Sequence, residues 1–356
     1  MNAFLELLLI AIGKRKSLSH QLSEQEWVNV YREANRQSLL GVILSGVERV
    51  CGTSSVNRPT FLMKWITQVV VLEQRNKFLD DKAIELIKIF ADDGYRSCIL
   101  KGQGVAKLYP DPQRRQCGDI DIWLEGERDE VLAYLKSKYL IGSPVIHHVD
   151  VTIFDNVPIE VHFIPSFAYS PFRYRRLKNF FSKKSSEQFS NYSEEYGFVL
   201  PTIEFNAVYF LLHIFHHVLH EGIGLRQLLD YYYILQRLEK KQKIEVFTTL
   251  RWMGLAKFTA AVMFVEKAFF ELEEEYFLCA PNVSLGKVLY KEILLSGNFG
   301  QHDERNQKVN RDSNYRAYLH NIKRNMLFLK FCPSEVLWAP IWKPCHFLWR
   351  KAKGYI

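Results

Sequence analysis

The chain has 356 residues, an apolar content of 48% and a formal net charge of +8. This length predicts two or three lobes, and the apolar content suits a packed globular core. The six cysteines are scattered without a Cys-x-x-Cys pair, which argues against a zinc site and a disulfide scaffold and favours a cytoplasmic protein. No apolar run approaches the length of a membrane span, so a transmembrane segment is not expected.

The first 75 residues are predicted to form a helical N-terminal region. Leu5 to Ile12 is apolar but short, with no basic residues before it and no cleavage site after it, so it predicts a packed helix and not a signal peptide. Ser23-Glu24-Gln25-Glu26 fits a capping box and predicts a helix from about residue 24. Further helices are expected over residues 38–50 and, as one long helix or two in series, over residues 60–93.

The stretch from residue 97 to 125 carries the first chemical motif. Cys98 to Leu100 is a short apolar run typical of a buried strand, and Lys101-Gly102-Gln103-Gly104 at its end predicts a tight turn. Val105 to Tyr109 predicts a short helix, which Pro110 and Pro112 stop. The run from Asp119 to Leu124 alternates polar and apolar residues like a strand, so its two aspartates share one face.

Two carboxylates on one strand face repel each other unless a cation lies between them. Magnesium suits such oxygen ligands, and a solvated strand edge is the alternative interpretation. A third acid, Glu160, lies between apolar neighbours in the second arm of a predicted hairpin whose turn contains Asp155-Asn156. Asp119, Asp121 and Glu160 are therefore expected to form one acidic cluster on adjacent strands.

The order of these motifs resembles the DNA polymerase β-like nucleotidyltransferase superfamily, and is closest to its family of uncharacterised nucleotidyltransferases. Four segments carry the resemblance: Leu100-Lys101-Gly102, Leu108-Tyr109-Pro110, Arg114 or Arg115, and Asp119-Ile120-Asp121. It extends over most of the chain, including a histidine-bearing helix near residue 213. The chain departs from the wider superfamily by having Lys101-Gly102 where a Gly-Ser or Gly-Gly pair is usual, which leaves open how a triphosphate is held.

The resemblance implies an α+β fold, in which a polymerase β-like nucleotidyltransferase core with a small mixed sheet is flanked by helical regions. The expected division is an N-terminal helical region over residues 1–75, the core over 76–190 and a C-terminal helical domain over 191–356. The implied reaction moves a nucleoside monophosphate from a nucleoside triphosphate such as ATP to an acceptor hydroxyl, with two Mg²⁺ ions. The acceptor is open: a small molecule, an RNA end and a protein side chain all remain.

The resemblance also implies roles for particular residues. Asp119 and Asp121 would bridge both metal ions, and Glu160 would hold one ion or take the proton of the acceptor. Gly102 and Gly104 would offer backbone contacts to the phosphates. The cationic candidates that would neutralise the phosphates are Lys101, Arg114 and Arg115.

A helix over residues 204–219 is strongly predicted and carries histidines at spacings i, i+3, i+4 and i+7, which put them on one stripe. These are His213, His216, His217 and His220. Three interpretations are open: a hydrogen-bonded core stripe, the lining of an active-site cleft, or a separate zinc site, which lacks supporting cysteines. The resemblance favours the cleft. On the next helix, Arg226 and Asp230 are spaced for an ion pair.

Two basic segments have no fixed interpretation. Residues 172–184 carry six lysines or arginines, no acid and four aromatics, which fits either a flap facing phosphate or nucleic acid or a solvated loop, and residues 185–196 predict a polar link. Residues 301–356 hold eleven Lys or Arg against four Asp or Glu. Their final tryptophans and cations are expected to dock on the body or on a membrane surface. Further helices are predicted over residues 244–253, 256–274, 284–295 and 315–331.

Two functions of other classes compete with catalysis. One is a catalytically silent nucleotide- or RNA-binding protein of the same fold, and the other is a peripheral membrane protein acting through the basic aromatic tail. Magnesium-dependent nucleotide binding separates the enzyme from both.

Overall fold

The computed structural model describes residues 2–52, 58–220, 222–298, 319 and 322–355. Five short strands from the middle of the chain form one mixed sheet in the order β1-β2-β5-β4-β3. The strands are β1 (Ser97–Ile99), β2 (Ile120–Leu124), β3 (Leu140–Ile141), β4 (His148–Thr152) and β5 (Ile159–His162). The central strands β2 and β5 are parallel, and every other neighbouring pair is antiparallel. The expected α+β class with a small mixed sheet is confirmed.

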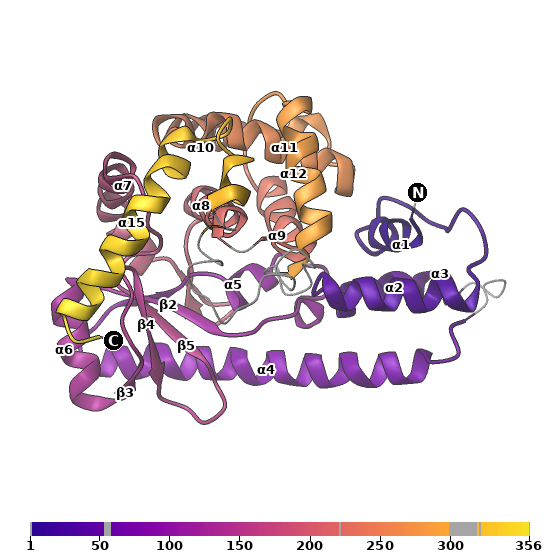
Figure 1. Cartoon of the computed structure of the whole chain (residues 1–356). Coiled ribbons are helices and arrows are strands. Elements are labelled where there is room, and N and C mark those ends of the chain that lie inside the picture. The colour runs from indigo at the N-terminus through magenta and orange to yellow at the C-terminus, as the bar shows by residue number, and fades with distance from the viewer. Residues whose placement is uncertain (1, 53–57, 221, 299–318, 320–321, 356) are drawn as a thin grey trace.

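Helices precede, cover and follow the sheet (Figure 1). Those before and within it are α1 (Ala3–Ala11), α2 (Glu24–Arg36), α3 (Leu40–Cys51), α4 (Leu62–Asp92), α5 (Gln103–Ala106), the 3₁₀ turn η1 (Pro112–Arg114), α6 (Arg128–Lys138) and α7 (Pro171–Phe189). A two-stranded hairpin follows, β6 (Tyr192–Ser193) and β7 (Phe198–Val199). The later ones are α8 (Ile203–His220), α9 (Leu225–Gln236), α10 (Lys240–Trp252), α11 (Ala256–Phe270), η2 (Glu274–Tyr276), α12 (Val283–Ser296) and α15 (Pro333–Ala352).

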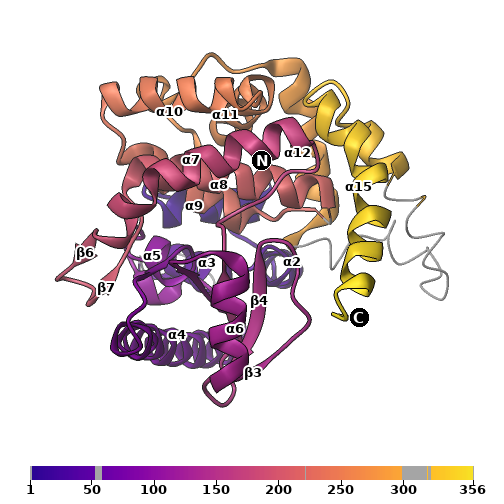
Figure 2. The same cartoon turned by 90° about the vertical axis from the view of Figure 1, so that its left-hand side faces the viewer.

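The two faces of the sheet have different neighbours, because side chains alternate along each strand. Ile120, Ile122 and Val161 pack with Leu86 of α4 and Leu135 of α6 in one apolar cluster. The opposite face carries the polar side chains and turns toward the C-terminal helices. There the Trp123 ring lies 5.9 Å from Phe205 of α8 and 4.6 Å from Phe189 of α7. The acids predicted to share a face therefore lie on the side of the sheet that faces the helical half. Figure 2 shows α7 and α8 of that half above β4.

Several local predictions are confirmed. The Ser23 hydroxyl accepts a hydrogen bond from the Glu26 amide, and Glu26 accepts one from the Ser23 amide, so the capping box starts α2 as expected. Residues 62–92 form one uninterrupted helix, α4, which is the first of the two alternatives predicted for residues 60–93. The domain boundary expected between residues 75 and 76 falls inside this helix. Strands β4 and β5 form the predicted hairpin, and Asn156 in its turn has a φ of 60°.

Three predictions need correction. The basic stretch 172–184 is neither a flap nor a loop, because it lies within the long helix α7; its Leu177 and Phe181 are buried. The same helix continues through Phe189, so the link predicted over 185–196 is only partly a connection. Asp230 pairs with Arg115 rather than with Arg226, whose guanidinium donates to the Gln116 carbonyl at 2.6 Å. The helix predicted over 315–331 lies partly outside the described residues.

The aromatic C-terminal helix α15 docks on the body. Its Trp342 stacks on Phe167 at a centroid distance of 5.0 Å, and Arg128 of α6 lies over the Trp349 ring at 4.9 Å. Glu335 at the start of α15 accepts hydrogen bonds from the amides of Tyr169 and Ser170, at 2.7 and 3.1 Å. Within the described part of the chain, no helix is both long and apolar enough to cross a membrane.

A buried carboxyl in α11 gives the fold a pH-dependent stability. Glu266 is 0% exposed, and neither of its oxygens has a hydrogen-bond partner among the described residues. Burial raises its pKa well above the ordinary value. In the unfolded chain the pKa of this carboxyl is about 4.3, and in the folded protein it is higher. At pH values between the two, the folded state binds one more proton than the unfolded state. The free energy of unfolding therefore falls as the pH rises above about 4.3.

We expect Glu266→Gln to stabilise the protein at neutral pH, because the amide carries no charge to desolvate. The advantage over wild type should grow with pH, at up to about 1.4 kcal/mol per pH unit, and disappear near pH 4. Urea unfolding of both proteins across this pH range measures it. A difference that stays constant with pH would contradict the assignment.

Candidate active site

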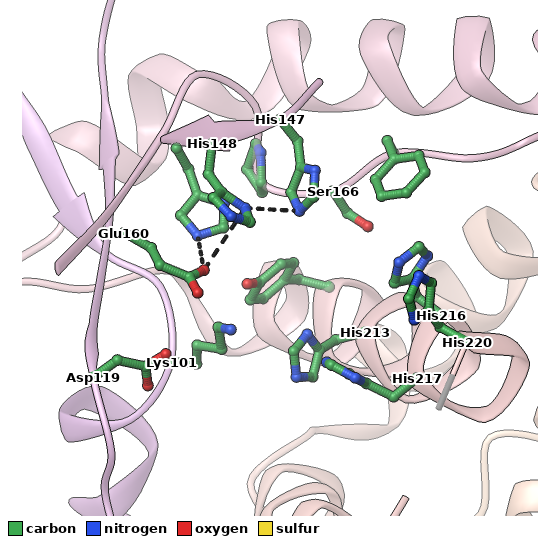
Figure 3. Close-up of a pocket in the computed structure, with 14 residues that line it drawn as sticks. Lys101, Asp119, His147, His148, Glu160, Ser166, His213, His216, His217 and His220 are labelled. Carbon is green, nitrogen blue, oxygen red and sulfur yellow. Dashed lines mark hydrogen bonds and ion pairs between the residues drawn. The ribbon is translucent and has the colours of Figure 1, made fainter. Parts of the chain in front are cut away.

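The parallel pairing of β2 with β5 brings two of the predicted acids together. Asp121 and Glu160 are Cα partners in this pair, so both side chains project from the same face of the sheet. Together with His162, they offer ligand atoms that all lie within 4.8 Å of one another. Asp119, two residues before Asp121, lines the same cavity as Glu160 (Figure 3).

Asp121 is the most enclosed member of the cluster, at 1% exposure. One of its oxygens, Oδ1, is 2.9 Å from the Lys101 ammonium and 2.9 Å from His162 Nε2. Burial alone would lower the pKa of Lys101, but the negative charge of Asp121 outweighs it and the pKa is raised, which keeps the lysine charged. The second oxygen, Oδ2, is buried without a hydrogen-bond partner among the described residues.

Glu160 is held in its ionised form. Its Oε2 is 3.5 Å from His162 Nε2 and 3.7 Å from His148 Nδ1. Burial opposes its ionisation, but the His162 hydrogen bond and the Lys101 charge outweigh burial and lower its pKa to about 2. Burial and the neighbouring His162 lower the pKa of His148 to about 4. At neutral pH the site therefore holds an ionised carboxylate beside a neutral imidazole.

These groups open into a cavity of about 450 Å³ between the sheet and α8. The four histidines of the predicted stripe all line it, from the α8 side: His213, His216, His217 and His220. The other wall contains Lys101, Asp119, His148 and Glu160. Burial lowers the pKa of His213 and His216 well below the ordinary value, so both rings are neutral at physiological pH. The α8 wall thus supplies uncharged imidazoles that hydrogen-bond without adding charge.

A second cavity of about 530 Å³ shares Lys101, Asp119 and His213 with the first. Its lining includes Gly102, Gly118 and two arginines, Arg115 and Arg226. The acids thus line two adjoining cavities of different character, one rich in histidine and one in which three cations face three carboxylates. Such a division suits a reaction between two bound molecules.

Three residues predicted to contact the phosphates have structural partners. Arg114 lines neither cavity; its guanidinium bonds Glu48 and lies 2.9 Å from Glu73 Oε1. Arg115 lines the second cavity but makes a two-pronged pair with Asp230, with both N–O distances at 2.7 Å. A Cβ on Gly104 would lie 2.5 Å from Leu200 Cδ2, so close packing explains this glycine.

Gly102 and Lys101 keep their place beside the acids. Gly102 has a φ of 60°, which favours glycine, and it caps the N-terminus of α5 within the second cavity. Lys101 lies two residues after the end of β1, and its ammonium reaches Asp121.

The sequence interpretation missed His147, His148 and His162. A signal for His162 was available, since it lies two residues after Glu160 and strand alternation puts both on one face. His148 is its Cα partner across the β4–β5 pair, which only the hairpin register reveals. His147 contacts His148 through ring nitrogens 3.0 Å apart.

The carboxylate cluster has the character of a divalent-cation site. Asp121 Oδ2 is buried and unpartnered, and Glu160 belongs with Asp121 to the group whose ligand atoms lie within 4.8 Å of one another. Asp119 is outside that group but lines a cavity with each of them. Carboxylate oxygens of this kind suit Mg²⁺, which prefers hard oxygen ligands and keeps part of its water shell. The residues present therefore fit a magnesium site.

Comparison with known proteins agrees with this chemistry. No curated protein and no solved structure matches the chain. A family model described as uncharacterised nucleotidyltransferase matches residues 23–271, which includes the acids, Lys101 and the histidine helix. Because the match covers well over half of the 356 residues, the chain belongs to this nucleotidyltransferase family.

Proposed function

We propose that the protein transfers a nucleoside monophosphate from a nucleoside triphosphate to an acceptor hydroxyl, and that residues 76–190 form a polymerase β-like core. The observation that carries this proposal is the pairing of Asp121 with Glu160 on β2 and β5, with Asp119 beside them. Family membership supports the same reaction class.

Asp119, Asp121 and Glu160 would hold two Mg²⁺ ions. Bound there, the ions would lower the pKa of the acceptor hydroxyl and neutralise the charge of the leaving pyrophosphate. Residues of the chain itself would contact the phosphates. Lys101 balances the carboxylates and offers a positive charge to the phosphates, and Gly102 lets the backbone turn approach them.

The two cavities suggest separate places for the two substrates. The second cavity contains Gly102 and Gly118, and its three cations, Lys101, Arg115 and Arg226, are balanced by the carboxylates of Asp119, Asp121 and Asp230. Bound Mg²⁺ would therefore supply the positive charge that a triphosphate needs. The first contains neutral His213 and His216 and ionised Glu160, which suits an acceptor whose hydroxyl group must lose a proton. This arrangement puts the acids between donor and acceptor, as an in-line transfer requires.

A silent nucleotide-binding protein of the same fold is the second candidate. The tight pairing of Lys101 with Asp121 favours it, because that ammonium competes with a cation for Asp121 Oδ1. This second candidate predicts that nucleotide binds independently of magnesium and that no product forms.

The wild-type protein is expected to melt at a higher temperature with Mg²⁺ and one nucleoside triphosphate together than with either alone. A ligand at about a hundred times its dissociation constant adds roughly 2.7 kcal/mol of stability. Thermal melting with each nucleotide measures this, and mass spectrometry of cell extract incubated with protein and labelled nucleotide identifies the adduct.

Glu160→Gln serves as the matched variant, since it keeps the size of the side chain and removes one proposed ligand charge. It should lose the magnesium dependence of the shift. If no triphosphate with Mg²⁺ stabilises the wild-type protein, the proposal is overturned. A rise in melting temperature that is the same with and without Mg²⁺ would favour the catalytically silent candidate.

A further inference from the structure

We propose that His147, His148 and His162 bind a transition-metal cation of the Zn²⁺ or Co²⁺ type, next to the carboxylate cluster. This cation is distinct from the Mg²⁺ ions of the proposed reaction, and its binding does not depend on that reaction. Glu160 lies between the two positions and would link them (Figure 3).

The backbone sets the three rings side by side. His148 and His162 are Cα partners in the antiparallel β4–β5 pair, so their side chains project from the same face. The ladder continues past the strand end, where the amide of Phe163 donates to the His147 carbonyl at 2.9 Å. His147 is thereby fixed next to the pair, with ring centroids 4.4 Å from His148 and 5.7 Å from His162.

The nitrogen atoms converge. One nitrogen from each ring lies within 4.8 Å of the other two, and His147 Nε2 is 3.0 Å from His148 Nδ1. Nitrogens bound to one zinc-type ion at about 2.1 Å are separated by roughly 3 to 3.5 Å. The His147–His148 distance already meets this spacing, and the His162 nitrogen lies within 4.8 Å of both.

A ring nitrogen of the cluster lacks a partner. His162 Nδ1, on the opposite side of the ring from the Asp121 contact, is buried with no hydrogen-bond partner among the described residues. Unpartnered buried nitrogens cost free energy, which a bound cation with its ordered water would recover. The Phe167 ring packs on the His147 ring, with 4.8 Å between their centroids, and holds the imidazole in place.

The carboxylate of Asp121 contacts one ring of the cluster. His162 Nε2 is 2.9 Å from Asp121 Oδ1, the contact that often orients a metal-binding histidine. Glu160 Oε2 is 3.7 Å from His148 Nδ1 and 3.5 Å from His162 Nε2, so this carboxylate can add an oxygen ligand. Imidazole nitrogens favour late transition metals such as zinc and cobalt over magnesium, because Mg²⁺ prefers oxygen ligands. The cation is therefore a nitrogen-binding transition metal.

Cobalt is the probe, because Co²⁺ absorbs visible light with an intensity that depends on its ligands. Untagged, chelator-treated protein is titrated with Co²⁺ in excess Mg²⁺ without nucleotide. We expect one Co²⁺ per chain, retained through gel filtration, and its spectrum should be abolished by Zn²⁺ but not by more Mg²⁺.

The double variant His147→Gln/His148→Gln should weaken Co²⁺ binding at least about tenfold. His213→Gln is the matched control, a histidine of the same cavity outside the trio, and should bind Co²⁺ like wild type. Circular dichroism checks that each variant is folded.

The X-ray anomalous signal of Co²⁺-loaded wild-type crystals locates the ion without any variant. A peak among the three rings supports the proposal. A peak elsewhere, no stoichiometric binding in excess Mg²⁺, or equal binding by the folded double variant would overturn it. Because no nucleotide is present, failure here is distinguishable from failure of the proposed transfer reaction.

Discussion

Asp119→Asn is expected to reduce nucleotide transfer about a hundredfold or more, while the melting temperature of the ligand-free protein stays unchanged or rises. This loss corresponds to roughly 2.7 kcal/mol or more of activation free energy. The carboxylate is half-buried and lines both cavities, so it is available to a metal ion. Removing its charge relieves repulsion from the neighbouring carboxylates Asp121 and Glu160, and the fold does not need it.

The measurement is thermal melting with and without Mg²⁺ and nucleotide, together with product analysis once an acceptor is found. Asp155→Asn is the matched control, because it makes the same change in the turn between β4 and β5, and it should transfer like wild type. If Asp119→Asn melted several degrees lower without ligand, Asp119 would be a structural residue.

Arg115→Met is expected to destabilise the ligand-free protein by about 3 to 5 kcal/mol, because it leaves Asp230 buried without its charge partner. Arg115 and Asp230 are 3% and 1% exposed, and two bonds of 2.7 Å join them. Tyr109 donates a third hydrogen bond to Asp230 Oδ1 at 2.7 Å. This pair joins the segment before β2 to α9, so its loss affects the fold as a whole.

Urea unfolding without nucleotide measures the effect. The double variant Arg115→Met/Asp230→Asn should recover part of the loss, since the amide still accepts from Tyr109 and no lone charge remains. Arg114→Met is the control: its partners Glu48 and Glu73 are 43% and 32% exposed, so about 1 kcal/mol or less is expected. Unchanged stability with lost nucleotide binding would instead make Arg115 a phosphate ligand.

The sequence by itself determined the local elements and the acidic strand. Alternation in Asp119 to Leu124 placed the aspartates on one face, and the Asp155-Asn156 turn predicted the hairpin that carries Glu160. The capping box predicted the start of α2, and the spacing in α8 put four histidines on one stripe. All of these depend on contacts between residues close in sequence, which periodicity and turn chemistry report directly.

Only the tertiary structure decided which distant groups meet. The sequence could not show that Asp230 takes Arg115 as its partner, since spacing within α9 pointed to Arg226. Lys101 reaches Asp121 because β1 and β2 lie side by side, and His148 meets His162 because of the β4–β5 register. A pattern along one element gives the face of a side chain, but the partner across a sheet or between lobes depends on register and packing.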